Sequence, residues 1–231
     1  MSQRILVINP NSLQAVTDGI SSALDGFRFA GGPDIQCETL HSGPPGIETQ
    51  THVDGITEKL VEWFDQVPDR KRADAVVVAC FSDPGVTALR ESLPMPVFGI
   101  GEASYLAAVP RAERFGVIAI LSRSIPRHRR TQRSLGLDHR LAGELAIDLG
   151  VAELASEEIV WKRMSGVGRR LREECGAGVL ILGCAGMARY RGRLEDLLGI
   201  PVIDPTQAAV GMAMAVLLAR RSAGATARAA A

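Results

Sequence analysis

The sequence predicts an α/β protein with two pseudo-symmetric domains, each built on an open parallel sheet. Two observations predict this fold class. Short runs of branched apolar residues such as Val76–Val78 end at small-residue turns, as strands buried on both faces of a parallel sheet do. One such run, with the turn behind it, also recurs in the second half of the chain, which indicates an internal duplication.

The duplicated unit contains a cysteine at its end in both halves. Cys80 closes an apolar run and precedes a small-residue turn, and Cys184 does the same. A further strand-like segment follows each cysteine, with Val97 placed 17 positions after Cys80 and Val202 placed 18 positions after Cys184. Because the spacing between the cysteine and the next strand is nearly the same in both halves, we expect the two halves to fold alike.

The elements of the first half follow in an order typical of α/β folds. A strand at Ile5–Ile8 leads through Asn9 into a helical pattern, Val16–Leu24. A second strand is expected near Ile35–Leu40, and the glycines and prolines after it force a defined loop. The helix Val53–Phe64, which has apolar residues along one side, then leads to the Cys80 strand.

The second half restarts at Phe115–Ile120, which corresponds to the first strand of the chain. Ser122 and Ser124 then open a helix. We expect one domain to comprise residues 1–103 together with 209–231 and to carry Cys80. The other is expected to comprise residues 104–208 and to carry Cys184.

Both cysteines are predicted at the carboxyl ends of strands, where open α/β sheets bind ligands. Backbone N–H groups and a helix dipole at that edge favour a thiolate, so a lowered cysteine pKa is expected. Two such thiols facing one cleft would make an acid/base pair. The alternative is that both are inert core cysteines, but their matched placement in the two halves favours a function.

Composition excludes several classes of partner. Lys plus Arg and Asp plus Glu both number 26, so neither nucleic acid nor an anionic membrane surface is indicated, and a small-molecule ligand fits better. Five arginines within residues 123–133 lack interleaved aromatic residues and predict a solvated helix face, although one of them could reach an anionic substrate. No signal peptide or membrane-length apolar stretch is evident, so a cytoplasmic location is expected.

No metal or cofactor is predicted. The four cysteines form no CxxC pair, and no histidine stands at a ligand spacing from them, so Cys37 and Cys175 are interpreted as structural residues. The segment Gly99–Ser104 superficially suggests a dinucleotide loop. It follows the fourth strand and lacks a complete GxGxxG with an acidic partner, so this signal is weak.

Taken together, six motifs in order resemble the aspartate/glutamate/hydantoin racemase superfamily, and within it the hydantoin and allantoin racemases. The similarity spans nearly the whole chain. The motifs are Ile8–Asn11, Gly43-Pro44 with Ile47-Glu48, Ala79–Gly85, Gly99–Ala103, Leu182–Met187 and Pro201–Asp204. The resemblance implies a cofactor-independent racemase with its active cleft between two α/β domains, and a homo-oligomeric assembly.

The resemblance also implies site residues. The catalytic cysteines of the family fall on Cys80 and Cys184. The positions expected to contact the substrate are Asn9, Pro44, Ile47, Phe81, Ser82, Asp83, Ala185, Gly186 and Met187. The chain departs from its relatives at Ser82, where glycine is usual, and at Ala119 and Ile120, where threonines are usual; the latter change removes hydroxyl groups expected to hold the substrate.

The implied reaction removes a proton from a carbon next to a carbonyl and returns a proton on the opposite face. Two thiols on opposite walls suit this task, one acting as base and the other as acid. A 5-substituted hydantoin or allantoin is the expected substrate. An aspartate or glutamate racemase, a small-dicarboxylate isomerase and a non-catalytic ligand-binding protein remain as alternatives.

Overall fold

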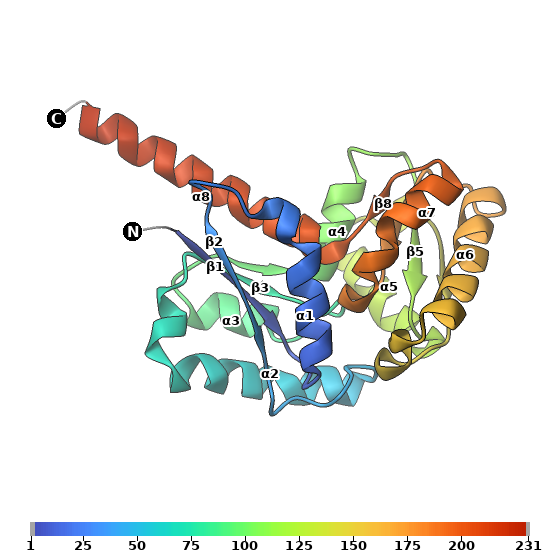
Figure 1. Cartoon of the computed structure of the whole chain (residues 1–231), viewed down its shortest axis with the longest axis horizontal. Helices are drawn as coiled ribbons and strands as arrows, with labels where there is room; N and C mark the ends of the chain where they lie inside the picture. Colours follow the sequence, from blue (N-terminus) through green and yellow to red (C-terminus); the bar gives the residue numbers. More distant parts are fainter. Residues whose placement is uncertain (1–2, 230–231) are drawn as a thin grey trace.

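Two four-stranded parallel sheets form the centre of the molecule, one in each half (Figure 1). The computed structural model describes residues 3–229. The sheets have equivalent strand orders, β2-β1-β3-β4 and β6-β5-β7-β8, which confirms the predicted pair of α/β domains. The strands are β1 (Arg4–Asn9), β2 (Asp34–Thr39), β3 (Ala75–Val78), β4 (Val97–Gly99), β5 (Phe115–Ala119), β6 (Leu141–Ala146), β7 (Val179–Leu182) and β8 (Val202–Ile203).

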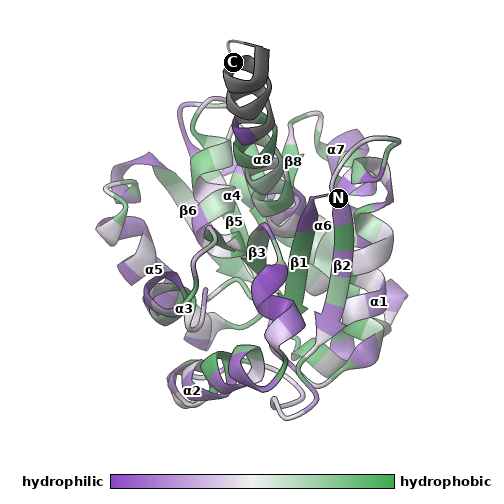
Figure 2. Cartoon of the chain, turned by 90° about the vertical axis from the view of Figure 1, so that its left-hand side faces the viewer, coloured by the Kyte–Doolittle hydropathy of each residue, from purple (hydrophilic) through white to green (hydrophobic). Residues whose placement is uncertain are grey.

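Helices cover both faces of each sheet, as the continuous apolar strands require. They are α1 (Gln14–Ala23), α2 (Gln50–Gln66), α3 (Val86–Ser92), α4 (Ile100–Ala108), α5 (Ile125–Ser134), α6 (Glu157–Glu173), α7 (Arg191–Leu198) and α8 (Pro205–Ala229). Figure 2 shows the hydrophobic strands β1 and β3 in the interior and hydrophilic residues on the surrounding helices. The helices predicted from residues 16 and 53 are therefore present and begin two or three residues earlier.

Alternate residues of the first sheet pack on different helices. Ile5 and Val7 of β1 point to the cluster that contains α1, α4 and α8. Leu6 and Ile8 point to the opposite cluster, formed with α2 and α3. Because every residue of β3 is buried as well, this sheet is apolar on both faces.

Helices α4 and α8 join the two halves. Ile100 and Ala103 of α4 pack in a first-sheet cluster, whereas Tyr105 and Ala108 pack beside β5 and β7 of the second. Helix α8 starts directly after β8 and runs back over the first half (Figure 1), where it contacts β3 and β4. The predicted boundary at residue 103 thus falls inside a shared helix, and the proposed limits of the domains stay predictions.

Candidate active site

Cys80 and Cys184 lie in turns that are closed by corresponding backbone hydrogen bonds, one in each domain. Cys80 follows β3 and Cys184 follows β7, strands with equivalent places in the two sheets. The carbonyl oxygen of Cys80 accepts a hydrogen bond from the Asp83 N–H at 2.9 Å, and that of Cys184 accepts one from the Met187 N–H at 3.2 Å. The structure therefore reproduces in space the correspondence of the two sequence motifs.

A single cavity between the domains is lined by both cysteines. It gathers residues that follow the carboxyl ends of strands in both sheets, the edge at which ligands bind in open α/β folds. Six of the predicted site residues line it: Ile47, Cys80, Phe81, Ser82, Cys184 and Ala185.

The cavity is small and is closed on one side by the loop after β2. Its volume is about 40 Å³, compared with roughly 150 Å³ for a protein cavity that holds a benzene ring. Glu48 of this loop forms an ion pair with Arg123 at 2.5 Å and accepts a hydrogen bond from the Val151 N–H at 3.1 Å. Because both partners belong to the second domain, these contacts hold the loop across the cavity, and a ring-sized ligand requires the space to widen.

A second pocket adjoins the first. Val16, Val151 and Ala185 line both, and the second has a volume of about 280 Å³. Gly186 lines only this second pocket. The second pocket therefore lies on the Ala185 side of the cysteine cavity.

Asn9 and Pro44 lie behind the cavity wall. The Asn9 side-chain amide donates hydrogen bonds to the Asn11 side-chain oxygen and to Thr17 Oγ1, both at 3.0 Å, and Asn9 is 1% exposed. Asn11, and not Asn9, lines the cavity. The carbonyl oxygen of Pro44 accepts a hydrogen bond from the Ser12 N–H at 3.0 Å. In this structure, both residues shape the strand-to-helix turn at the site.

The Asp83 carboxylate points away from the cavity and caps α4. It accepts hydrogen bonds from the Gly101 N–H at 2.8 Å and the Glu102 N–H at 2.7 Å. A Cβ on Gly99 would lie 2.4 Å from this carboxyl carbon, so only glycine permits the approach. Asp83 itself has a left-handed backbone with φ of +48°. It therefore fixes the Cys80 turn to α4.

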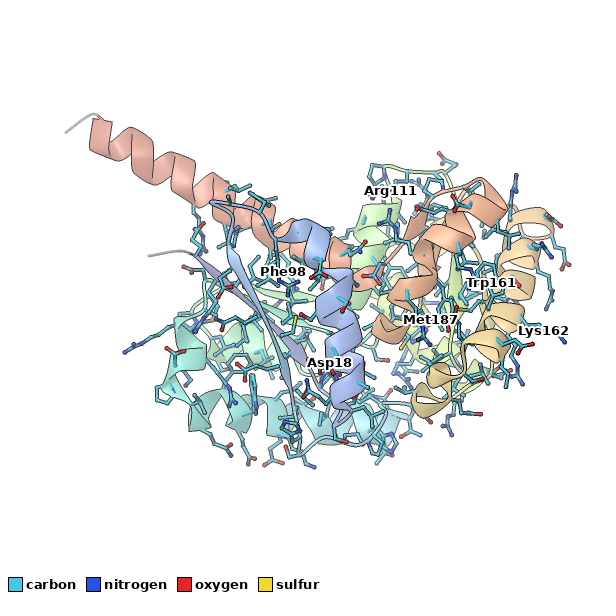
Figure 3. The ribbon with its side chains drawn as sticks, in the orientation of Figure 1. Asp18, Phe98, Arg111, Trp161, Lys162 and Met187 are labelled. Carbon is cyan, nitrogen blue, oxygen red and sulfur yellow. The ribbon has the colours of Figure 1, made fainter. Side chains whose placement is uncertain are left out.

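Met187 is a core residue. Its side chain is fully buried in the cluster that fills the second domain, inward of α6, which carries Trp161 (Figure 3). Its contribution to the site is the backbone N–H that closes the Cys184 turn.

Several cavity residues are absent from the sequence-based prediction of the site. Arg127 and His128 enter from α5, and the former belongs to the arginine run interpreted as a solvated face. That interpretation is correct for Arg123, Arg130 and Arg133, which are exposed, and wrong for Arg127, which is 8% exposed. The other such residues are Asn11, Val16, Glu48, Ala79, Ile120, Leu121, Ser124, Val151 and Gly183.

His128 belongs to a buried polar network under the cavity. Its Nδ1 lies 2.5 Å from a carboxylate oxygen of Glu144, whose other oxygen accepts a hydrogen bond from the Gln132 amide at 3.2 Å. The ring packs edge to face against Phe81, with the ring centroids 4.9 Å apart. The network therefore fixes the orientation of His128 and of the aromatic ring next to Cys80.

The expected lowering of the cysteine pKa values is wrong for this structure. Burial raises the pKa of Cys80 to about 12 and that of Cys184 to about 11. The predicted N–H groups are present, since those of Ser82 and Gly186 hydrogen-bond to the respective sulfurs and lower the pKa of each thiol. Loss of hydration outweighs them, so the pKa of each thiol lies above its usual value.

Charged groups differ between the two turns. Near Cys80 the Arg127 guanidinium opposes the rise of the thiol pKa, while Asp83 adds to it. Near Cys184 the charged groups are the carboxylates of Asp204 and Glu48, and both raise the thiol pKa. The two cysteines thus hold corresponding places in the two sheets and differ in their electrostatic surroundings.

The described residues form neither a metal-binding cluster nor a membrane-spanning helix. Within residues 3–229 no group of three or more His, Cys, Asp or Glu side chains is arranged to hold a metal ion. Over the same residues, no helix combines the length and apolar character needed to cross a membrane.

The fold and the cavity define a two-domain α/β protein in which two cysteines line one cavity between the domains, and comparison with known proteins places it in a family. Residues 5–213 match the family model described as Asp/Glu/Hydantoin racemase. The chain belongs to this family and is an enzyme of the isomerase class, a racemase.

The relatives agree with this placement. The chain is 35% identical over 211 residues to a hydantoin racemase of Paenarthrobacter aurescens, covering 91% of this chain and 89% of the relative. Its structure is similar to that of allantoin racemase from Klebsiella pneumoniae, with a TM-score of 0.88, 32% identity and coverage of 94% and 88%. A glutamate racemase from Francisella tularensis shares the fold at 16% identity, with a TM-score of 0.69 and coverage of 95% and 82%.

Proposed function

We propose that this racemase interconverts the enantiomers of a 5-substituted hydantoin or of allantoin, with Cys80 and Cys184 as its two bases. The main supporting observation is that both cysteines, in matching turns of two domains, line one cavity. The hydantoin and allantoin racemases among its relatives support the choice of substrate.

In the proposed reaction the cysteine that starts as a thiolate takes the proton from the carbon next to the ring carbonyl. The electrons of the broken C–H bond move to the carbonyl oxygen and form an enolate. The other cysteine, still a thiol, then gives its proton to the opposite face of the same carbon. The two cysteines have exchanged protonation states, which equips the site for the reverse enantiomer.

The raised thiol pKa values suit a weakly acidic carbon. A thiolate formed in the buried site is a stronger base than one in water, although it is rarer at neutral pH. The cavity must widen when the ligand enters. We therefore expect the ionising thiol to lose its proton in the complex with the ligand. The scheme uses protein side chains alone and needs no cofactor.

The composition of the cavity supports a largely neutral ring over an amino acid. Ile47, Phe81 and Ile120 provide apolar walls, and Ile120 is one of the positions where threonine is usual in relatives. Ala119, the other such position, is fully buried at the end of β5. Aspartate or glutamate would require groups for an ammonium and two carboxylates, so an amino acid racemase is the second candidate.

Loss of optical rotation tests the proposal directly. We expect the parent protein to racemise allantoin or single enantiomers of alkyl and aryl hydantoins, and to leave aspartate and glutamate unchanged. Cys80→Ser and Cys184→Ser should each lower the activity by about 1000-fold. Cys37→Ser and Cys175→Ser, at the two cysteines outside the cavity, should keep it.

Three results would contradict the proposal. Racemisation of aspartate or glutamate with no action on any cyclic ureide would favour the second candidate. Full activity in either of the two cavity variants would exclude the two-base assignment. Absence of any turnover in the parent across this screen would reject the substrate class.

A further inference from the structure

Arg127 is a buried cation in the wall of the cysteine cavity. It lies on α5, and its side chain reaches across to the first domain, where Nε donates a hydrogen bond to Ser82 Oγ at 2.9 Å. Ser82 is two residues beyond Cys80. The guanidinium is therefore held next to the Cys80 turn by a contact between the two domains.

Most of the hydrogen-bonding capacity of Arg127 is unused. A guanidinium carries five N–H donors. Within residues 3–229 the bond to Ser82 is the one hydrogen bond of this side chain, and no carboxylate forms an ion pair with it. Burial without a counter-ion lowers the pKa of Arg127. A charge that is partly withdrawn from water and has no ion-pair partner is stabilised when a ligand brings negative charge to it.

The neighbouring carboxylates are engaged elsewhere. Glu144, whose side chain is fully buried, is hydrogen-bonded to His128 and Gln132 through its two oxygens. Glu48 is paired with Arg123 and accepts the Val151 N–H. Asp54 is the carboxylate that raises the pKa of Arg127, but it accepts a hydrogen bond from the Gln50 side-chain amide and forms no ion pair with Arg127. Among the described residues no carboxylate is paired with Arg127, which lines the cavity.

We propose that Arg127 binds the substrate carbonyl oxygen that becomes negative when the neighbouring carbon loses its proton. This assignment rests on the proposed function for the identity of the reaction. The carbonyl oxygen lies two bonds from the carbon that Cys80 must touch, so a donor beside the Cys80 turn stands at the right place. Arg127 keeps its own protons and donates hydrogen bonds that strengthen as charge develops on the oxygen.

Kinetics on two substitutions test this role. Arg127→Met removes the charge, and we expect kcat/KM to fall by about 100-fold or more, mainly through kcat, because one donor to an enolate-like oxygen is lost. Arg127→Lys keeps the charge without the planar fork and should retain part of the lost rate. Arg133→Met, an exposed position on the same helix, is the control and should keep the parent rate.

A binding measurement separates this inference from the substrate assignment. Barbiturate is a planar cyclic ureide that is anionic at neutral pH, so it resembles the enolate without reacting. By calorimetric titration we expect the parent and Arg133→Met to bind it at least about tenfold more tightly than Arg127→Met, a difference near 1.4 kcal/mol. Thermal unfolding of each variant establishes that it is folded.

The outcomes are distinct. Equal binding of barbiturate by parent and folded Arg127→Met, or no binding by the parent, would overturn the role of Arg127. A rise in KM with kcat unchanged in Arg127→Met would overturn the proposal that Arg127 acts on charge that develops during the reaction. Binding that depends on Arg127 in a parent that racemises no ureide would uphold the anion site and reject the proposed function.

Discussion

The Cys80 turn and the Cys184 turn share one backbone hydrogen bond and differ in the charges around them. Each cysteine follows the third strand of its sheet, and its carbonyl oxygen accepts a hydrogen bond from the residue three positions on. Asp83 and Arg127 act on the first sulfur with opposite sign, whereas Asp204 and Glu48 act on the second with the same sign. The duplicated fold therefore supplies two sulfurs that line one cavity, and the charged residues around them make the two sulfurs chemically different.

The largest expected effect comes from replacing each cysteine, and it shows which enantiomer each cysteine deprotonates. Cys80→Ser and Cys184→Ser should each lower racemisation by about 1000-fold, because one proton transfer loses its acid or base. Each variant keeps one thiol, so each should still exchange the substrate hydrogen of one enantiomer, and the two variants should select opposite enantiomers. Proton NMR of each pure enantiomer in D₂O measures this exchange. Exchange of the same enantiomer by both variants would contradict opposed placement.

The second prediction concerns alkaline stability. In the unfolded chain a cysteine ionises near pH 9, whereas the buried thiols stay protonated up to about pH 12 and 11. The folded state thus binds more protons between these values, and the free energy of unfolding should fall as pH rises above 9, by about 1 kcal/mol per pH unit for each thiol.

Urea unfolding at pH 8, 9 and 10 measures this dependence. The double variant Cys80→Ser with Cys184→Ser serves as the reference, because it retains every other titrating group. The difference between parent and double variant should be constant below pH 9 and should shrink above it. A difference that stays constant throughout would mean that the thiols are not buried in solution.

The third prediction compares the aspartates that cap the two helices behind the turns. Both oxygens of Asp83 accept backbone N–H groups at the start of α4. At α8, Asp204 Oδ1 accepts the Gln207 N–H at 2.8 Å, while its Oδ2 is buried with no partner among the described residues. Burial raises the pKa of Asp83 to about 7 and that of Asp204 to about 6, so each charge is costly at neutral pH.

Asp83→Asn should lose about 1–2 kcal/mol of stability, because its amide group replaces an acceptor that faces an N–H donor. Asp204→Asn should leave stability nearly unchanged, because the amide NH₂ of the asparagine can take the place of Oδ2, the oxygen that has no partner. Chemical unfolding at pH 7.5 compares the two. Equal losses would show that the caps are equivalent in solution.

The smallest expected effect comes from a substitution in the loop after β2, which closes one side of the cavity. Glu48→Gln removes the ion pair with Arg123, which is 56% exposed at its side chain, and keeps an oxygen that can accept the Val151 N–H. Stability should fall by less than about 1 kcal/mol, as for other exposed pairs. Because the loop is held less firmly, KM should change more than kcat. A loss of kcat with KM unchanged would instead place Glu48 in the chemistry.

The sequence predicts those parts of the site that depend on local pattern. Apolar runs and their duplication predicted two parallel sheets and placed Cys80 and Cys184 at corresponding strand ends, as the structure confirms for the fold. The role of Asn9 and Asp83 depends on where their hydrogen bonds go, and both are satisfied within the protein. A single sequence carries no signal that distinguishes such an internal contact from a contact with a ligand.

The sequence does not predict which residues of the two domains contact one another. Arg127 and Ser82 are 45 positions apart, and helical periodicity gives the faces of α5 without saying which one turns toward the other domain. The predicted direction of the shift in the thiol pKa values is wrong for a related reason. The N–H groups that lower them are local and visible in the turn motif, whereas the stronger effect of burial arises only when both domains close over the sulfurs.

The origin of the proton on the product tests the two-base claim most directly. The parent enzyme is given a single substrate enantiomer in D₂O, and both enantiomers are separated at low conversion for mass spectrometry. Transfer between two different sulfurs predicts that the newly formed enantiomer carries deuterium while the remaining substrate does not. Deuterium appearing equally in both enantiomers, or a product that retains the original hydrogen, would contradict it.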